Sequence, residues 1–275
     1  MTTKTGTTPG LAIAFGAGGA RALGSLGVMS VLAKHGIEPA AVSGSSMGSI
    51  IAAYYGVHGQ TETLRTWYEE KKTGDYLSYM TRPSVTAGWI DTHKLQNLID
   101  GFLKKKQFKD TLVPVNIVCT DLRRGKETVY RHGPLINPVM ASIAIPGVIH
   151  PHKIRQEYFV DGGVTNPTPA DVFLQKYTHT LAIDFHFHVP KHLNDPSMMN
   201  VFMRSFMIAQ HAAFEHHKTL FPKNCTILAP KTVPGIEDLR FDKARQYILF
   251  GERAGKTLIR QWKRNGVYEQ LIETE

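Results

Sequence analysis

Short apolar runs alternate with longer stretches of helical spacing along most of this chain. Strand-like runs are expected at 11–15, 37–42, 115–119, 159–161, 181–185 and 226–228. Most of the segments between them repeat apolar residues at helical intervals, as 20–32 does. Alternating strands and helices build a largely parallel sheet with helices packed against it. The pattern therefore predicts an α/β sandwich.

The chain is long enough for one large core, with 275 residues of which 42% are hydrophobic. It has no Pro/Gly/Ser-rich linker, so we expect a single domain over 10–275 behind a polar, Thr-rich tail at 1–9. Neither a signal core nor an apolar run of membrane-spanning length is found. Cys119 and Cys225 lie in strand-like runs and are expected to be buried thiols rather than a disulfide. A cytoplasmic protein is the resulting prediction.

The segment from Gly44 to Gly48 reads Gly-Ser-Ser-Met-Gly and fits the nucleophile-elbow pattern G-x-S-x-G. A strand is predicted before it and a helix after it, which is the setting that the pattern requires. Ser46 would stand on the sharp turn between them, beside a helix N-terminus that favours developing negative charge. The segment makes Ser46 a candidate nucleophile, although an ordinary Gly/Ser turn would have the same sequence.

A glycine loop, Gly16-Ala17-Gly18-Gly19, follows the first predicted strand and precedes a predicted helix. Such a loop offers backbone N–H groups to an anion, either a phosphate or the oxyanion of acyl transfer. Arg21 stands where the dinucleotide fingerprint needs glycine, so a phosphate site is disfavoured. Close packing of a helix on the sheet would explain Gly24 and Gly27.

A third glycine-rich turn begins at Asp161 and continues with Gly162 and Gly163. The apolar run before it would deliver the Asp161 carboxylate to the end of a strand. Taken alone, Asp-Gly-Gly is among the commonest turn sequences and indicates no chemistry.

In this order along the chain, the three segments resemble the patatin-like phospholipase family. The matches are Gly16 to Arg21 with the oxyanion-hole motif G-x-G-G-x-R/K, Gly44 to Gly48 with the serine motif, and Asp161 to Gly163 with the D-G-A/G motif. Thr120-Asp121-Leu122 and 141–146 are similar to two further family stretches. The resemblance covers about 10–185 and leaves a helical C-terminal extension. It implies a three-layer α/β/α sandwich. Ala22 and Ser45 depart from the family pattern, where glycine and threonine are usual.

The resemblance also implies a serine-aspartate dyad that acts without metal or cofactor. Ser46 would attack an ester carbonyl and Asp161 would take its proton. Backbone N–H groups around Gly18 and Gly19, in the motif that begins at Gly16, would stabilise the oxyanion, and Arg21 would brace the loop. The implied substrate is a phospholipid or related acyl lipid. A protein of the same fold that binds acyl chains or regulates a partner without turnover is the alternative.

Histidines offer two further alternatives. A conventional α/β-hydrolase would place one near Ser46, although its nucleophile normally follows more strands than the two predicted here. Asp184, His186 and His188 would share one face of a strand and could ligate a metal, but no carboxylate-rich partner motif accompanies them. No histidine spacing singles itself out.

The formal net charge of +9 indicates a basic surface. Much of the excess comes from Lys104 to Lys106, Arg123, Arg124 and the series Arg240, Lys243, Arg245, Arg253, Lys256, Arg260, Lys263 and Arg264. A solvated face without a partner is one interpretation, and peripheral contact with an anionic membrane is the other. No nucleic-acid reader motif is present. The oligomeric state is left open.

Overall fold

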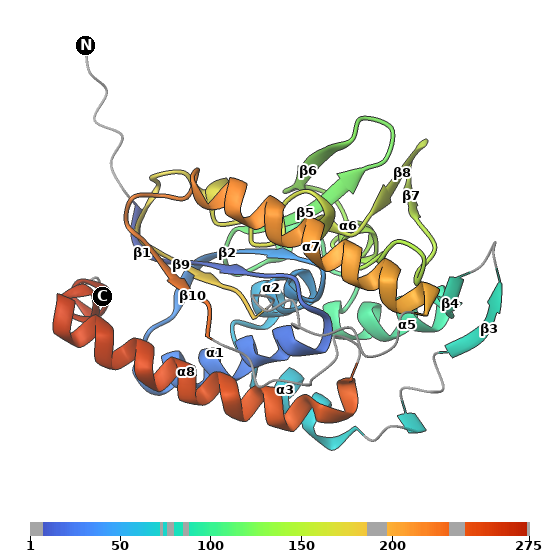
Figure 1. Ribbon diagram of the computed structural model, residues 1–275. Coiled ribbons are helices and arrows are strands. Elements are labelled where there is room, and N and C mark those ends of the chain that lie inside the picture. Colours follow the sequence, from blue (N-terminus) through green and yellow to red (C-terminus); the bar gives the residue numbers. More distant parts are fainter. Residues whose placement is uncertain are drawn as a thin grey trace, which may run out of the picture.

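The computed structural model describes residues 8–71, 74–75, 80–84, 88–185, 197–230 and 240–273, and Figure 1 shows their arrangement. The strands are β1 (Thr8–Phe15), β2 (Pro39–Ser45), β3 (Met80–Ser84), β4 (Gly88–Ile90), β5 (Val115–Asp121), β6 (Lys126–Tyr130), β7 (His152–Ile154), β8 (Glu157–Val160), β9 (Tyr177–Ile183) and β10 (Cys225–Leu228). The α-helices are α1 (Gly24–Lys34), α2 (Met47–His58), α3 (Glu62–Glu70), α5 (Thr92–Leu103), α6 (Ile136–Ser142), α7 (Met198–Lys218), α8 (Ala244–Asn265) and α9 (Val267–Ile272). Short 3-10 turns are η1 (Gly19–Leu23), η2 (Phe108–Asp110), η3 (Gly162–Val164), η4 (Asp171–Phe173) and η5 (Phe241–Lys243).

A central sheet joins eight of the described strands in the order β10-β9-β1-β2-β5-β8-β7, with β6 also paired to β5. From β10 to β5 every neighbouring pair is parallel. Beyond β5 the pairing turns antiparallel, since β6 and β8 both run against β5 and β7 runs against β8. The predicted, largely parallel sheet is confirmed. The antiparallel strands were missed where they are short or polar, as in β6 and β7.

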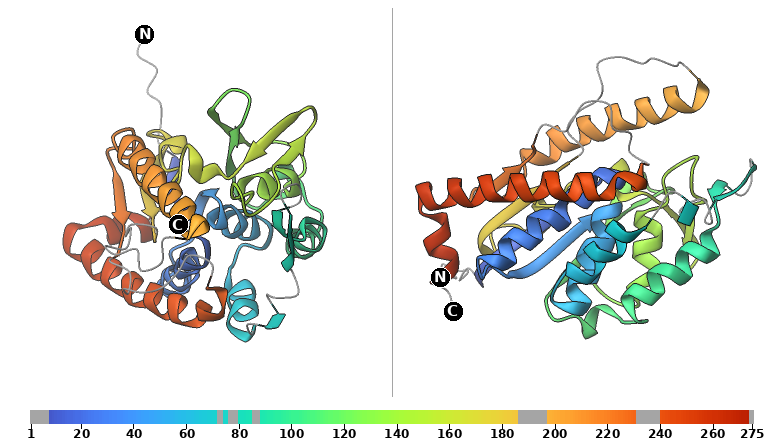
Figure 2. Two further views of the ribbon diagram at one scale, coloured as in Figure 1. Left: turned by 45° about the vertical axis from the view of Figure 1, so that its right-hand side comes forward. Right: turned by 90° about the horizontal axis from the view of Figure 1, so that it is seen from below.

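Helices cover both faces of the sheet, as Figures 1 and 2 show. Side chains of β1 explain why the two faces differ. Leu11, Ile13 and Phe15 point into the large core that contains the apolar sides of α1, α2 and α8. Ala12 and Ala14 point the other way, into a smaller cluster with Phe173. The fold is therefore an α/β/α sandwich with the larger hydrophobic core on one side of the sheet.

Glycines bring α1 and α8 into close contact. A Cβ on Gly27 would collide with the Ile248 carbonyl, and one on Gly251 would collide with the Gly24 backbone. The sequence predicted that Gly24 and Gly27 serve helix-on-sheet packing, and this is wrong for Gly27, whose partner is the helix α8. A Cβ on Gly24 would instead collide with the Phe185 ring, just beyond β9. The long C-terminal helix is thus part of the core layer.

The two cysteines are free thiols, as predicted. Cys119 is buried, and burial holds the pKa of its thiol well above the usual value. Cys225 is only partly buried, so the expectation of two buried thiols is wrong for this residue. Within the described part of the chain, no helix is long and apolar enough to cross a membrane.

Candidate active site

Ser46 occupies a sharp turn between β2 and α2. Its φ of 53° and ψ of −128° belong to a turn position that glycine usually fills. Holding a serine there costs about 1–3 kcal/mol. A Cβ on Gly44 would collide with the Gly48 carbonyl, and a Cβ on Gly48 would collide with the Phe15 carbonyl. Gly44 is therefore required for the close approach of β2 and α2 that the motif predicts, and Gly48 for the approach of α2 to the end of β1.

Hydrogen bonds hold this turn in place. The Ser46 N–H donates to Ser142 Oγ at 2.9 Å, and Ser142 Oγ donates to the Val118 carbonyl at 2.6 Å. On the other side, Ser49 Oγ donates to the Ser46 carbonyl at 2.6 Å. Ser142 thus links the turn to β5. The sequence indicated Ser142 only through the similarity of 141–146 to a family stretch, which assigned it no contact.

Asp161 follows the last residue of β8. Its N–H donates to the Ala144 carbonyl at 3.0 Å, and its own carbonyl accepts from Thr120 Oγ1 at 2.9 Å. The side chain folds back, so that Oδ1 accepts from the Gly163 N–H at 2.7 Å. Gly162 has no room for a side chain, because a Cβ there would collide with the Val118 carbonyl. The backbone and one carboxylate oxygen of Asp161 are thereby fixed.

The second carboxylate oxygen of Asp161 meets Ser46. Ser46 Oγ donates to Asp161 Oδ2 at 2.6 Å, across 115 residues of sequence. Asp161 is fully buried and Ser46 is 5% exposed. Burial raises the pKa of Asp161 to about 7, although the hydrogen bonds from Ser46 and Gly163 act in the opposite direction. This pKa is close to the value that suits a general base at neutral pH.

The glycine loop after β1 lies beside the same site. Gly16 N–H donates to the Ile183 carbonyl at 2.8 Å and Ala17 N–H to the Pro167 carbonyl at 2.7 Å, so neither amide is free to bind an oxyanion. Gly18 and Gly19 have φ values of 134° and 53°, which favour glycine. Gly19 lines a cavity together with Ser46. Arg21 is buried, with only 2% of its surface exposed.

A cavity of about 260 Å³ lies next to Ser46. Its other walls are almost wholly aliphatic and aromatic: Met47, Ile50, Trp67, Tyr68, Ile90, Leu95, Leu98, Ile99, Phe102, Ile143, Ile145, Val148, Ile149 and Phe241, with Gly19. They come from η1, α2, α3, β4, α5, the segment after α6, and η5. Sequence reasoning missed these residues because they read as ordinary core positions of separate elements. Only the fold gathers them at one serine.

Histidines take no part in this geometry within the described part of the chain. None lines the cavity, and none bonds to Ser46 or Asp161. His179 bonds to Thr226 Oγ1 at 2.7 Å, and burial lowers its pKa to about 4. His186 and His188 lie outside the described residues. Asp184, their expected neighbour, is buried and accepts from Thr168 Oγ1 at 3.2 Å.

A family model for patatin-like phospholipases matches residues 13–174, which include Ser46, Asp161 and the glycine loop. The chain belongs to the patatin-like phospholipase family. The resemblance inferred from the three motifs is thereby confirmed. The matched residues cover more than half of the chain and end just after η4, so α7 and α8 lie beyond them.

Two relatives of this patatin-like chain are longer proteins that it matches only in part. An uncharacterised NTE family protein of Mycobacterium tuberculosis is 31% identical over 160 residues, which are 58% of this chain and 44% of that protein. Patatin-like phospholipase domain-containing protein 6 of Mus musculus is 27% identical over 152 residues, 54% of this chain and 11% of that protein. The chain thus matches less than half of these relatives. Among solved structures, VipD from Legionella pneumophila aligns with 93% of this chain and 67% of its own at a TM-score of 0.48 and 14% identity.

Proposed function

We propose that this patatin-like domain is a lipid acyl hydrolase that cleaves carboxylic esters of phospholipids or related acyl lipids through Ser46 and Asp161. The observation that carries the proposal is the 2.6 Å hydrogen bond from Ser46 Oγ to the buried Asp161 carboxylate. It lies beside a cavity with apolar walls. A nucleophile, a base and an apolar binding space therefore meet at one position.

In the proposed reaction, Ser46 Oγ attacks the ester carbonyl carbon while its proton passes to Asp161 Oδ2. Asp161 then returns this proton to the leaving alcohol as the carbon–oxygen bond breaks, and an acyl-enzyme forms on Ser46. Water attacks the acyl-enzyme in the second half. Asp161 takes a proton from the water and delivers it to Ser46 Oγ, which leaves the free acid and restores the enzyme.

The negative charge on the tetrahedral intermediate requires hydrogen-bond donors near Ser46. We assign this role to the N–H groups of Gly18 and Gly19 and to that of Met47, the residue that follows the serine. Met47 begins α2, so its N–H belongs to the first turn, where helix amides have no acceptor within the helix. Gly16 contributes space and sheet pairing to the loop, and Arg21 braces it.

The cavity supports an acyl chain as the bound group. Its aliphatic and aromatic walls would bury a hydrocarbon chain, which gains about 0.8 kcal/mol for each methylene removed from water. We therefore expect purified protein to turn over p-nitrophenyl esters, and kcat/KM to rise with chain length until the cavity is full. A fluorophosphonate probe should label the protein at Ser46. Phospholipids with matched acyl chains then test the head group. Absence of both labelling and turnover in folded protein would leave acyl-chain binding as the function.

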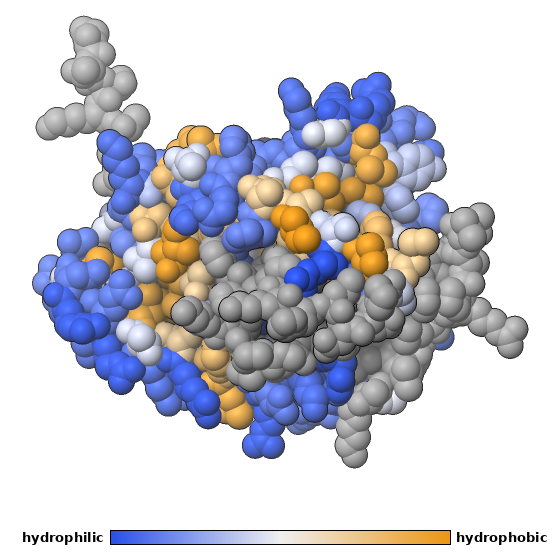
Figure 3. Space-filling model, in the orientation of Figure 1, coloured by the Kyte–Doolittle hydropathy of each residue, from blue (hydrophilic) through white to orange (hydrophobic). Residues whose placement is uncertain are grey.

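We also propose peripheral contact between the basic face of α8 and an anionic lipid surface. Arg245, Arg253, Lys256, Arg260, Lys263 and Arg264 are exposed along this helix, whose outer side is largely hydrophilic in Figure 3. The helix begins directly after η5, where Phe241 lines the cavity. In Figure 1 the β5–β6 hairpin with Arg123 and Arg124 lies on the opposite side of the molecule. One flat membrane cannot contact both surfaces.

Vesicle co-sedimentation tests this contact. Binding to anionic vesicles should weaken as salt rises to about 0.5 M, because the attraction is screened beyond a Debye length. The double variant Arg253→Glu/Lys256→Glu should bind much less, whereas the matched pair Arg123→Glu/Arg124→Glu should bind as wild type does. Turnover of a small soluble ester should change in neither. Equal binding to neutral and anionic vesicles would contradict the proposal.

A further inference from the structure

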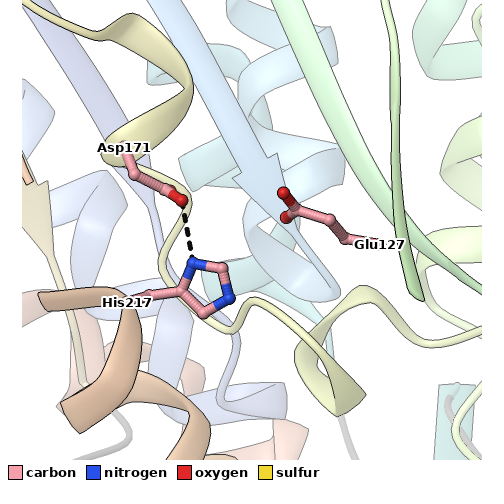
Figure 4. Close-up of side chains that lie close together, drawn as sticks. All are labelled: Glu127, Asp171 and His217. Carbon is pink, nitrogen blue, oxygen red and sulfur yellow. Dashed lines mark hydrogen bonds and ion pairs between the residues drawn. The ribbon is translucent and has the colours of Figure 1, made fainter. Parts of the chain in front are cut away.

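Three side chains with metal-binding chemistry converge away from the Ser46 cavity. Glu127 comes from β6, Asp171 from η4 and His217 from α7, and Figure 4 shows them facing one another. One potential ligand atom of each lies within 4.8 Å of the others. His217 Nδ1 and Asp171 Oδ2 are 2.8 Å apart, and these side chains are only 14% and 12% exposed. None of the three lines the cavity.

Asn166 adds an observation that is independent of the charged groups. Its side chain is fully buried and directed into the cluster, where Nδ2 donates to Glu127 Oε2 at 3.0 Å and to Asp171 Oδ1 at 2.9 Å. Its Oδ1 is buried without a hydrogen-bond partner, a costly arrangement for an amide oxygen. A half-turn of the amide would direct this oxygen toward the two carboxylates. Such an orientation is favourable only when a cation lies between them.

The orientation of His217 fits a metal ligand as well. Its Nδ1 lies 2.8 Å from Asp171 Oδ2, inside the cluster, and the backbone of Thr165 is a second polar neighbour of the ring. Metal-binding histidines typically donate their other ring N–H to a carbonyl or carboxylate, which fixes the ring and its tautomer. In that state the Nδ1 lone pair of His217 points into the cluster.

We propose that Glu127, Asp171 and His217 bind a divalent transition-metal ion of the Zn²⁺ type, with Asn166 Oδ1 as an additional oxygen ligand. Two carboxylates, an imidazole and an amide form a mixed nitrogen and oxygen donor set, which suits Zn²⁺ better than Mg²⁺. Bonds of about 2.0–2.2 Å to a central ion require these side chains to rearrange, because His217 Nδ1 and Asp171 Oδ2 lie 2.8 Å apart and would have to separate to make room for it. This proposal departs from the expectation, implied by the family resemblance, of a site that acts without metal. The site is independent of the hydrolase proposal.

The bound ion would join α7 to the segment that follows Asp161. Asn166 and Asp171 belong to this segment, and Gln210 of α7 already fills the space beside Gly163. Gln210 is 4% exposed, so the helix covers this turn closely. We therefore expect the ion to stabilise the folded chain rather than to take part in ester cleavage.

Calorimetric titration of the full chain, treated with EDTA and dialysed, tests the site. At about pH 8, wild type should bind one Zn²⁺ per chain and melt at a higher temperature with Zn²⁺ than with Mg²⁺. His217→Gln and Glu127→Gln should each weaken Zn²⁺ binding by about tenfold or more. His216→Gln, at the neighbouring position of the same helix, should bind as wild type does.

Two results would overturn the site: no Zn²⁺ binding by wild type, or unchanged affinity in Glu127→Gln. Glu127 is exposed on β6, so its replacement does not threaten the fold. Glu127→Gln therefore tests the metal site even if circular dichroism shows that His217→Gln unfolds in EDTA.

Discussion

Ser46→Ala should lower turnover of every ester substrate by at least about a thousandfold, because it removes the nucleophile and leaves only binding and oxyanion stabilisation. The change deletes one hydroxyl at a position that is 5% exposed, so the fold should persist. Steady-state kinetics with a p-nitrophenyl ester, together with circular dichroism, would measure both effects. Fluorophosphonate labelling should disappear in the same variant.

The neighbouring serine provides a matched control. Ser45 is also buried, and its Oγ has no hydrogen-bond partner among the described residues. Ser45→Ala makes the same chemical change one residue earlier and should retain most of the activity. If Ser46→Ala remained active with an unchanged spectrum, or if only Ser45→Ala were inactive, Ser46 would not be the nucleophile.

Asp161→Asn should lower kcat/KM by about two to four orders of magnitude, the usual contribution of a general base. An asparagine fills the same space and still accepts from the Gly163 N–H, but it cannot take the Ser46 proton. Replacement of any single histidine by alanine should cost far less. If one histidine variant were as inactive as Ser46→Ala, the catalytic residues would form a triad rather than a dyad.

The pH dependence of wild-type activity also tests the assignment of Asp161 as the general base. Asp161 must be ionised to accept a proton, and its pKa is raised to about 7 by burial. We therefore expect kcat/KM to rise as pH increases, with a midpoint near this value, and to level off above it. Asp161→Asn should lose this limb. A rate that falls over the same interval would contradict the role of Asp161 as a base.

The contribution of Asp161 to the free energy of unfolding should fall as pH rises, whereas activity should increase. The pKa of Asp161 is about 7 in the folded chain, whereas an aspartate in water has a pKa of 3.8, so folding favours the neutral carboxyl. This stabilisation is fully present below about pH 4 and is lost as pH rises toward 7. Above pH 7 the buried charge costs on the order of a few kcal/mol, a cost that asparagine avoids. Asp161→Asn should therefore melt at or above the wild-type temperature near pH 8, which separates lost chemistry from lost folding.

The sequence by itself determined the features that depend on neighbouring residues. The turn at Ser46 can be predicted from the Gly44–Gly48 motif, because close approach of the flanking strand and helix excludes a side chain at Gly44. The parallel half of the sheet follows from apolar runs that alternate with helices. Asp161 was a weaker prediction, since only its combination with the other two motifs distinguished it from a common turn.

Tertiary structure decided everything that depends on distant residues. Several features join segments that are far apart in sequence. They are the contact between Ser46 and Asp161, the hydrogen bonds from Ser142 and Thr120, the apolar cavity, and the cluster at His217. No local pattern encodes such contacts. The type of a side chain determines its chemistry, but only the fold determines which other side chains it contacts. Burial has the same origin: the pKa of Asp161 is raised because the completed fold, rather than any neighbour in sequence, removes its carboxylate from water.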